Sequence, residues 1–299
     1  MNKVYVLSPG ENWIVDRFAK EWYEDNSDIS VRSPADADVI WLLADWCWKH
    51  VPQKFLSSKK VITTVHHIVP EKFGKDELLD FMVRDDYTTV YHVYNQLTQN
   101  FIRRLTNKPI HLIPYWANQK IWNQTGSKEE FRKKYNIPLD KFVIGSFQRD
   151  TEGYDLKSPK LEKGPDLLAD YIEKKVSDSQ KPHVLLAGWR RQYIIDRIKK
   201  IGIEYSYLER PSQEVINELY QCLDVYPVTA RCEGGPQSLI ECGLTNTPVI
   251  SRNVGIADQV LPPESINDNV SLATPHVPDV SGWLLPFGYT KYREMIRFL

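Results

Sequence analysis

The sequence predicts an α/β protein made of two doubly wound lobes with a cleft between them. Short apolar strands alternate with helical segments along the chain, which is the pattern of parallel α/β units. The pattern restarts near residue 141, and 299 residues are enough to form two separate cores. Ligands of doubly wound sheets bind at the carboxyl ends of the strands, so we expect the functional residues there.

In the first half, apolar runs predict strands and the segments between them predict helices. The expected strands are Lys3–Leu7, Asp38–Leu43, Lys60–Val65, Thr89–Tyr94 and Ile110–Ile113. The expected helices are Asn12–Glu24, Asp76–Asp85 and Gln96–Thr106. Lys128–Asn136 has the pattern of a short charged helix with few core positions. We therefore place the first lobe at residues 1–136 and a linker at Ile137-Pro-Leu-Asp.

The second lobe, residues 137–286, repeats this alternation. Its expected strands are Lys141–Ser146, His183–Ala187, Tyr205–Leu208, Asp224–Pro227 and Pro248–Ser251. Its expected helices are Gly164–Val176, Arg190–Ile201, Ser212–Cys222 and Pro236–Leu244. A final helix within residues 287–299 is expected to pack back on the first lobe.

Composition excludes several classes of protein. A net charge of −1 and a pI near 6.7 provide no general basic field for nucleic acid. No run of 18 apolar residues predicts a transmembrane segment, and the first residues lack the core of a signal peptide. The four cysteines have no metal-binding spacing, and neither a dinucleotide nor a P-loop glycine motif is present. We expect a cytoplasmic protein without a metal or other cofactor.

The segment Glu233-Gly-Gly-Pro-Gln-Ser-Leu-Ile-Glu241 lies between two predicted strands. A strand, a glycine loop and a helix N-terminus form a socket for an anion, because the first N–H groups of a helix have no partner within it. Pro236 suits the first helical position, since it has no N–H group. Glu241 is then about 8 Å along the helix from Pro236, so the two glutamates cannot serve one proton transfer. They could bind the two ends of an elongated ligand such as a nucleotide sugar.

These residues resemble glycosyltransferase family 4, whose members are retaining, metal-independent enzymes with the GT-B fold of two Rossmann-like lobes. Glu233 and Glu241 reproduce the family's pair of glutamates, and Thr247-Pro-Val-Ile is similar to the strand that follows. Further segments resemble the family over most of the chain: Ile113–Asn118, Phe142–Arg149, Lys163–Leu168 and Leu219–Pro227.

The resemblance implies that Arg149 and Lys163 bind the diphosphate of a donor. Residues 150–162 separate this pair more widely than in the family, so Lys157 or Lys160 could take the place of Arg149. An arginine would supply a planar fork for two oxygens and a lysine a compact charge. These cations would stabilise the leaving group as its negative charge grows.

The resemblance also assigns the residues around the glutamates. Glu233 would accept hydrogen bonds from donor-sugar hydroxyls, and Glu241 would bind the ribose hydroxyls. Smaller contributions are implied for backbone positions and loops. Gly234 and Gly235 would allow close approach of the backbone to the donor, and Gln237 and Ser238 would donate N–H groups to its phosphate. Leu208 and Arg210 would contact the base. His66 would face the donor sugar, and Gly10 would lie in a phosphate-facing or acceptor-facing loop.

The expected activity is transfer of a hexose, with retention, from GDP-mannose or a UDP-hexose such as UDP-glucose to an acceptor hydroxyl. The acceptor would be a glycan, a lipid or a protein-linked group, and a homodimer is compatible with the sequence. One alternative is a sugar-nucleotide 2-epimerase, which would need further acid/base carboxylates that the sequence does not identify. Another is a non-catalytic nucleotide-sugar-binding protein, which is disfavoured because Arg149, Lys163, Glu233 and Glu241 are all present.

Overall fold

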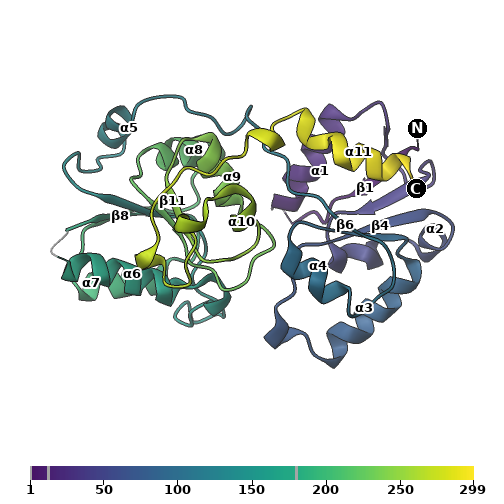
Figure 1. Cartoon of the computed structure of the whole chain (residues 1–299), viewed down its shortest axis with the longest axis horizontal. Coiled ribbons are helices and arrows are strands. Elements are labelled where there is room, and N and C mark those ends of the chain that lie inside the picture. The colour runs from purple at the N-terminus through teal and green to yellow at the C-terminus, as the bar shows by residue number, and fades with distance from the viewer. Residues whose placement is uncertain (1, 12–13, 179–180) are drawn as a thin grey trace. The chain divides into compact units, whose positions relative to one another are not determined.

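The computed structural model describes residues 2–11, 14–178 and 181–299. The chain forms two compact units, and each is described by itself. Unit 1 comprises Met1–Trp116 and Pro286–Leu299, and unit 2 comprises Ala117–Leu285. Figure 1 shows the helices and strands of both units, coloured along the chain.

Unit 1 contains a six-stranded sheet whose strands all run parallel. In chain order the strands are β1 (Val4–Leu7), β2 (Ser30–Val31), β3 (Val39–Leu42), β4 (Lys60–Val65), β5 (Val90–Val93) and β6 (Ile110–Leu112). They are arranged as β2-β1-β3-β4-β5-β6, so the winding reverses between β1 and β3. β3 and β5 are buried along their whole length, as expected for parallel strands covered on both faces.

The helices of unit 1 come from both ends of the chain. They are α1 (Ile14–Asp25), α2 (Gln53–Leu56), α3 (Lys75–Tyr87), α4 (Gln96–Ile102) and α11 (Thr290–Arg297). α1 buries Val15, Phe18 and Trp22, which share one helix face. In α11, Tyr292 is fully buried and its hydroxyl donates to the carbonyl of Pro114 over 2.8 Å. The C-terminal helix thus completes the core of unit 1.

Unit 2 contains five parallel strands around one junction. They are β7 (Val143–Ser146), β8 (His183–Ala187), β9 (Tyr205–Leu208), β10 (Tyr226–Val228) and β11 (Val249–Ser251). β7, β8 and β9 form one ladder and β10 and β11 another. A parallel bridge between Ile144 and Val225 and a 3.0 Å hydrogen bond from Gly145 N to Val225 O join the two. The resulting order is β9-β8-β7-β10-β11, and its winding reverses between β7 and β10.

The helices of unit 2 are α5 (Lys128–Lys134), α6 (Pro165–Ser177), α7 (Gln192–Lys200), α8 (Gln213–Gln221), α9 (Gln237–Leu244) and α10 (Ala257–Val260). α6 and α7 pack on β7 and β8 through one apolar cluster that includes Leu168, Ile172, Ile194 and Ile198. Gly145 packs closely against α8's neighbour Leu223, because a Cβ atom at Gly145 would lie 2.2 Å from Leu223 Cδ1.

The expected domain boundary at residue 136 differs from the division seen here, where unit 2 already begins at Ala117. α5 is part of unit 2, because the Arg132 side chain is buried there and pairs with Asp224 at 2.7 Å. Arg132 Nε also donates to the carbonyl of Cys222 over 2.9 Å. A buried arginine with specific partners is not visible in a sequence pattern, which shows only a charged helix.

The prediction of two parallel α/β lobes is confirmed, with most boundaries within a few residues of those expected. The first residues of the expected helix Asn12–Glu24 lie outside the described residues. β2, α2 and α10 were not predicted, because elements of two to four residues are too short to show a period. Of the helices that the structure describes, none combines the length and apolarity needed to cross a membrane.

Candidate functional site

The reversal of winding between β7 and β10 marks a topological switch point in unit 2. In an open α/β sheet, the loops at such a point diverge and leave room for a ligand at the carboxyl ends of the strands. β7 ends at Ser146 and continues to Gln148 and Arg149. β10 ends at Val228 and continues through Thr229 to the glutamate segment. Most of the predicted donor-binding residues follow these two strands.

Lys163 and Glu233 form an ion pair beside this point. Lys163 ends a 3₁₀ turn before α6, and Glu233 lies in the loop between β10 and α9. Their side chains are 22% and 12% exposed, so both reach solvent only in part. The structure therefore brings together two residues predicted to bind neighbouring parts of one donor.

Arg231 ties the two loops to each other. Its backbone N–H donates to the carbonyl of Glu162 over 2.8 Å, next to Lys163. Its guanidinium donates to both carboxylate oxygens of Asp166, in the first turn of α6, at 2.7 and 2.5 Å. This bidentate pair raises the pKa of Arg231 and lowers that of Asp166. The pair of Lys163 with Glu233 is thus held by hydrogen bonds between its own loops.

Gly164 allows the Lys163 turn to approach β10. It has a φ of +63°, and a Cβ atom there would lie 1.9 Å from the carbonyl oxygen of Thr229. Gln148 fixes the other side, because its Nε2 donates to the carbonyl of Lys163 over 2.8 Å. α6 begins directly afterwards with Pro165, so its N-terminus lies at the same edge as Lys163.

The residues that separate Arg149 from Lys163 form a loop whose two ends lie close together. Lys160 N donates to the carbonyl of Asp150 over 2.8 Å, which brings the end of this loop back to its start. Burial lowers the pKa of Lys160, and the nearby charges of Arg149 and Lys163 lower it further. Lys157 is exposed farther out. Arg149, Lys160 and Lys163 therefore form one cationic cluster despite the long separation in sequence, and Lys160 in it also pairs with Glu162 at 3.3 Å.

α9 begins at Gln237, and Pro236 is its N-cap residue rather than its first helical residue, which corrects the prediction. A ψ of 115° places Pro236 outside the helical region. Gly234 and Gly235 are buried, and Gln237 and Ser238 occupy the first turn. Gly255, in the loop after β11, covers this turn: a Cβ atom there would lie 2.6 Å from Pro236 Cδ.

Glu241 lies within α9 and is 9% exposed. Tyr220 of α8 donates its hydroxyl to Glu241 Oε2 over 2.7 Å. Burial and the charge of Glu241 raise the pKa of Tyr220, so this hydroxyl keeps its proton and its role as donor. The bond fixes the orientation of the carboxylate, and Tyr220 is a supporting residue that the sequence did not reveal.

An aromatic and cationic cluster lies beyond the neighbouring strands. Trp189, just after β8, is 44% exposed, and the guanidinium carbons of Arg190 and Arg210 each lie 4.9 Å from its ring centroid. Both arginines have positive φ values, 61° and 49°, which are uncommon for residues other than glycine. Leu208, the last residue of β9, accepts a hydrogen bond from Gly188 N at 3.1 Å. Trp189 was not predicted, because a lone tryptophan after a strand forms no motif.

In unit 1, His66 follows β4 and both of its ring nitrogens have partners. Nε2 donates to the carbonyl of Leu43 at 2.8 Å, which leaves Nδ1 to accept from the Tyr115 hydroxyl at 3.3 Å. Burial lowers the pKa of His66 to about 4, so the ring is neutral at physiological pH. Trp46 and Tyr94 pack around it, with ring centroids 5.8 and 5.1 Å away.

The Gly10 loop of unit 1 follows β1, beside the other reversal of winding. Gly10 has a φ of 76°, and its N–H donates to Asp16 Oδ1 over 2.8 Å. Ser8 also donates to this carboxylate. Glu11 accepts from the indole of Trp46 at 3.0 Å, and Trp46 is 44% exposed. Gly10 and His66 belong to unit 1, whereas the other predicted site residues belong to unit 2.

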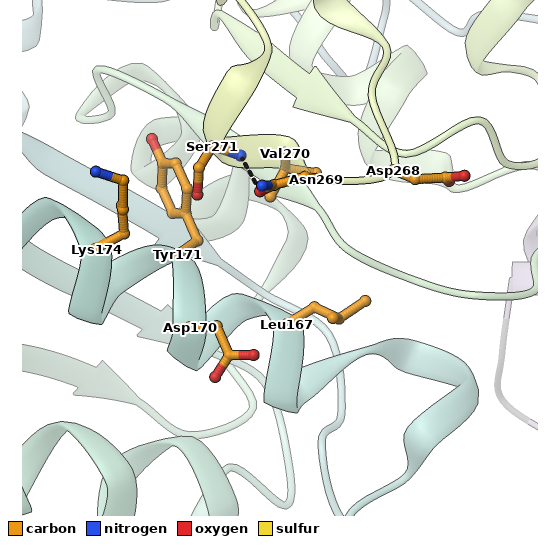
Figure 2. A pocket seen from close by; sticks show the side chains of 8 residues that line it. All are labelled: Leu167, Asp170, Tyr171, Lys174, Asp268, Asn269, Val270 and Ser271. Atoms are coloured by element: carbon orange, nitrogen blue, oxygen red, sulfur yellow. Dashed lines mark hydrogen bonds between the residues drawn. The ribbon is translucent and has the colours of Figure 1, made fainter.

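Figure 2 shows a pocket of about 370 Å³ in unit 2, between α6 and the turn Val270–Leu272. The predicted site residues do not line it. Its charged residues already have partners, since Asp170 pairs with Arg197 at 3.3 Å and Lys174 with Asp178 at 2.8 Å. Because Lys163, Glu233 and Glu241 lie at the switch point and not in this pocket, we take the switch point as the candidate site.

No protein-family model and no curated protein matches this sequence. Solved structures do. Anabaena Alr3699/HepE in complex with UDP and glucose superposes with a TM-score of 0.69 at 14% identity, over 91% of this chain and 88% of that one. Sucrose-phosphate synthase from Thermosynechococcus elongatus gives 0.62 at 17% identity, over 98% of this chain and 76% of that one. TarM gives 0.55 at 14% identity, over 78% of this chain and 45% of that one.

At these identities the likeness establishes the fold. The chain has the GT-B fold of two Rossmann-like lobes that these structures share, as the sequence predicted.

Proposed function

We propose that this chain is a glycosyltransferase that moves a hexose from a nucleoside-diphosphate sugar to an acceptor hydroxyl, with retention and without a metal ion. The observation that carries this proposal is the pairing of Lys163 with Glu233 at the switch point of unit 2. The two residues would bind adjacent parts of a donor, the diphosphate and the sugar. The GT-B fold is consistent with this activity.

The charges at the switch point suit a departing diphosphate. Lys163, Lys160 and Arg149 supply positive charge, and the N-termini of α6 and α9 add the positive ends of their helix dipoles. In the proposed reaction the bond from C1 of the sugar to the diphosphate oxygen breaks. A bond from the acceptor oxygen to C1 forms on the same face, and the acceptor proton passes to the departing phosphate oxygen. The cationic cluster would stabilise the charge that develops on that oxygen.

The other residues suit the remaining parts of a nucleotide sugar. Glu233 would accept hydrogen bonds from sugar hydroxyls, and the buried, oriented carboxylate of Glu241 would accept from the ribose. Trp189 and Arg210 would stack on the base, and base–aromatic stacking contributes about 1–3 kcal/mol. The role that the resemblance assigns to His66 stays a prediction, with a neutral ring as its starting state.

The first donor to test is UDP-glucose, since HepE was solved with UDP and with UDP-glucose. GDP-mannose is the second. Calorimetric titrations with UDP-glucose, GDP-mannose, UDP, GDP and pyrophosphate, all in the presence of EDTA, would rank the donors and test the independence from metal. Lys163→Ala should weaken every diphosphate compound by about tenfold or more, because a charge-assisted hydrogen bond is lost.

Lys157→Ala is the matched control, because Lys157 is an exposed cation of the loop between Arg149 and Lys163. Equal affinities of the Lys163→Ala variant and the unaltered chain would contradict the proposed site. Turnover separates the activities. Release of nucleoside diphosphate supports a transferase, conversion to an isomeric nucleotide sugar indicates an epimerase, and binding without turnover indicates a binding protein.

A further inference from the structure

Helix α3 of unit 1, labelled in Figure 1, carries exposed aliphatic side chains on one face. Leu78, Leu79, Met82 and Val83 are 38%, 51%, 57% and 48% exposed. The opposite face carries Phe81 and Arg84, which are buried. Four neighbouring aliphatic side chains on one helix face form an exposed apolar patch of the kind that marks an interaction site.

Charged residues end this face with opposite signs. Lys75, Leu79, Met82 and Asp86 follow one another at spacings of four, three and four residues, so they lie along one line of the helix. Lys75 is at the N-terminal end and Asp86 at the C-terminal end, and both are exposed. The line is symmetric about its midpoint: a cation and an anion at the ends, with aliphatic side chains between them.

We infer that this face binds a second copy of the chain, with the two α3 helices antiparallel. A two-fold axis at the midpoint would place Lys75 of each copy opposite Asp86 of the other, with the aliphatic residues packed between the two pairs. Such an isologous contact uses the same patch on both subunits. Helices with Leu and Met side chains pack at about 8–10 Å between axes, which lets both charged pairs form.

The charge of α3 disfavours a lipid surface as the occupant. The helix sequence KDELLDFMVRDDY contains five carboxylates and two cations, and one of those cations, Arg84, is buried. Anionic headgroups would offer Asp86 no cation, whereas a second copy offers Lys75 to it. Asp80, on one side of the helix, is already neutralised by Lys49 at 2.7 Å and Arg84 at 3.0 Å. Lys75 and Asp86, at the two ends of the line, remain available to pair with the second copy.

One helix pair buries less than the ~1,600 Å² of a standard interface, so we expect a dimer that dissociates at about micromolar concentration or above. Sedimentation equilibrium of the full chain over a concentration series measures this. Met82→Glu places a charge in the centre of the patch and should raise the dissociation constant at least about tenfold. Leu139→Glu, which alters a leucine of unit 2 that is 49% exposed, is the control and should leave it unchanged.

Charge exchange provides the sharper test. K75E and D86K should each weaken the dimer several-fold, and the double variant should recover it, because a glutamate then faces a lysine in both pairs. Circular dichroism of each variant shows whether it is folded. A monomer at all concentrations, a dimer indifferent to Met82→Glu, or a double variant weaker than either single one would overturn the inference. Binding of the monomer to anionic vesicles through Met82 would also overturn it, in favour of a membrane surface.

Discussion

Lys163 pairs with Glu233, so an anion that binds Lys163 has to compete with that carboxylate. Glu233 therefore has two opposite effects in the proposed site. It would bind the sugar of a donor, but it would weaken the binding of a ligand that has only phosphates. Exchange of this one residue separates the two effects.

We predict that Glu233→Gln binds pyrophosphate more tightly than the unaltered chain and transfers sugar more slowly. A partly exposed ion pair contributes about 0.2–1 kcal/mol, so the gain in pyrophosphate affinity should be about 1.4- to fivefold. Calorimetry measures the affinity, and release of nucleoside diphosphate from the donor measures the rate. Unchanged pyrophosphate affinity would show that the ion pair does not oppose phosphate binding.

Gly164 is the residue on which the approach of the Lys163 turn to β10 depends. We predict that Gly164→Ala lowers the free energy of unfolding by more than Gly202→Ala. Both glycines have positive φ, +63° and +69°, and an alanine in this region costs about 1 kcal/mol. Only at Gly164 would the added Cβ atom also overlap a backbone carbonyl, 1.9 Å away, whereas nothing lies within 4 Å at Gly202. Urea denaturation of the two variants compares them, and equal losses would refute the close approach.

Within unit 1, a chain of hydrogen bonds runs from β3 through β4 and β5 to the residue that follows β6. Trp41 Nε1 donates to Thr64 Oγ1 at 2.8 Å, Thr64 donates to His92 Nδ1 at 2.9 Å, and His92 Nε2 donates to the carbonyl of Ile113 at 3.0 Å. The Thr64 hydroxyl has one proton, which it donates to His92 Nδ1, and Nε2 carries the proton of the ring. Since Nδ1 accepts, His92 is neutral. Burial lowers its pKa to about 3.

The stability of the chain should therefore fall on mild acidification. An unfolded histidine has a pKa near 6.5 and binds a proton below that pH, whereas folded His92 does not until about pH 3. The free energy of unfolding should decrease by about 1 kcal/mol for this group between pH 7.5 and 5.5. Urea denaturation across this range tests it. His92→Gln should reduce the slope, exposed His50→Gln should not, and equal slopes in all three would contradict the prediction.

Elements with a clear period and motifs with fixed spacing were predictable, and tertiary pairing was not. The strands and most helices follow from the apolar pattern, and Glu233, Glu241 and Lys163 follow from their motif. The approach of Lys160 to Arg149 depends on a hydrogen bond that joins the two ends of the loop between Arg149 and Lys163, and no local sequence pattern encodes that bond. Arg231 and Tyr220 act through single contacts with Asp166 and Glu241, and such supports become visible only in three dimensions.

In the whole molecule, unit 2 is inserted between two segments of unit 1. The second segment is short but its contribution to the core is large. The Tyr292 ring is fully buried; it stacks on Trp41 with ring centroids 5.3 Å apart and meets His92 edge-on at 5.1 Å. Without it, the aromatic core of unit 1 would be open on one side.

Tyr292→Ala should destabilise unit 1 by about 3–5 kcal/mol, the usual cost of removing a large buried ring. Calorimetry should show the transition of unit 1 at a lower temperature and that of unit 2 unchanged. Phe298→Ala, at an exposed residue of the same segment, should leave both transitions in place. A shift of both transitions by equal amounts with Tyr292→Ala would show instead that the chain unfolds as one cooperative body.

The insertion of unit 2 also sets an order of events during translation. Ala117–Leu285 emerges from the ribosome as a continuous stretch and holds every partner it needs for its own sheets. Trp41 and His92 are synthesised before this stretch, by contrast, and gain their contacts with Tyr292 only after it. Unit 1 therefore begins to be synthesised before unit 2 but completes its core after it, and in the interval its exposed apolar residues form a surface of the kind that chaperones bind.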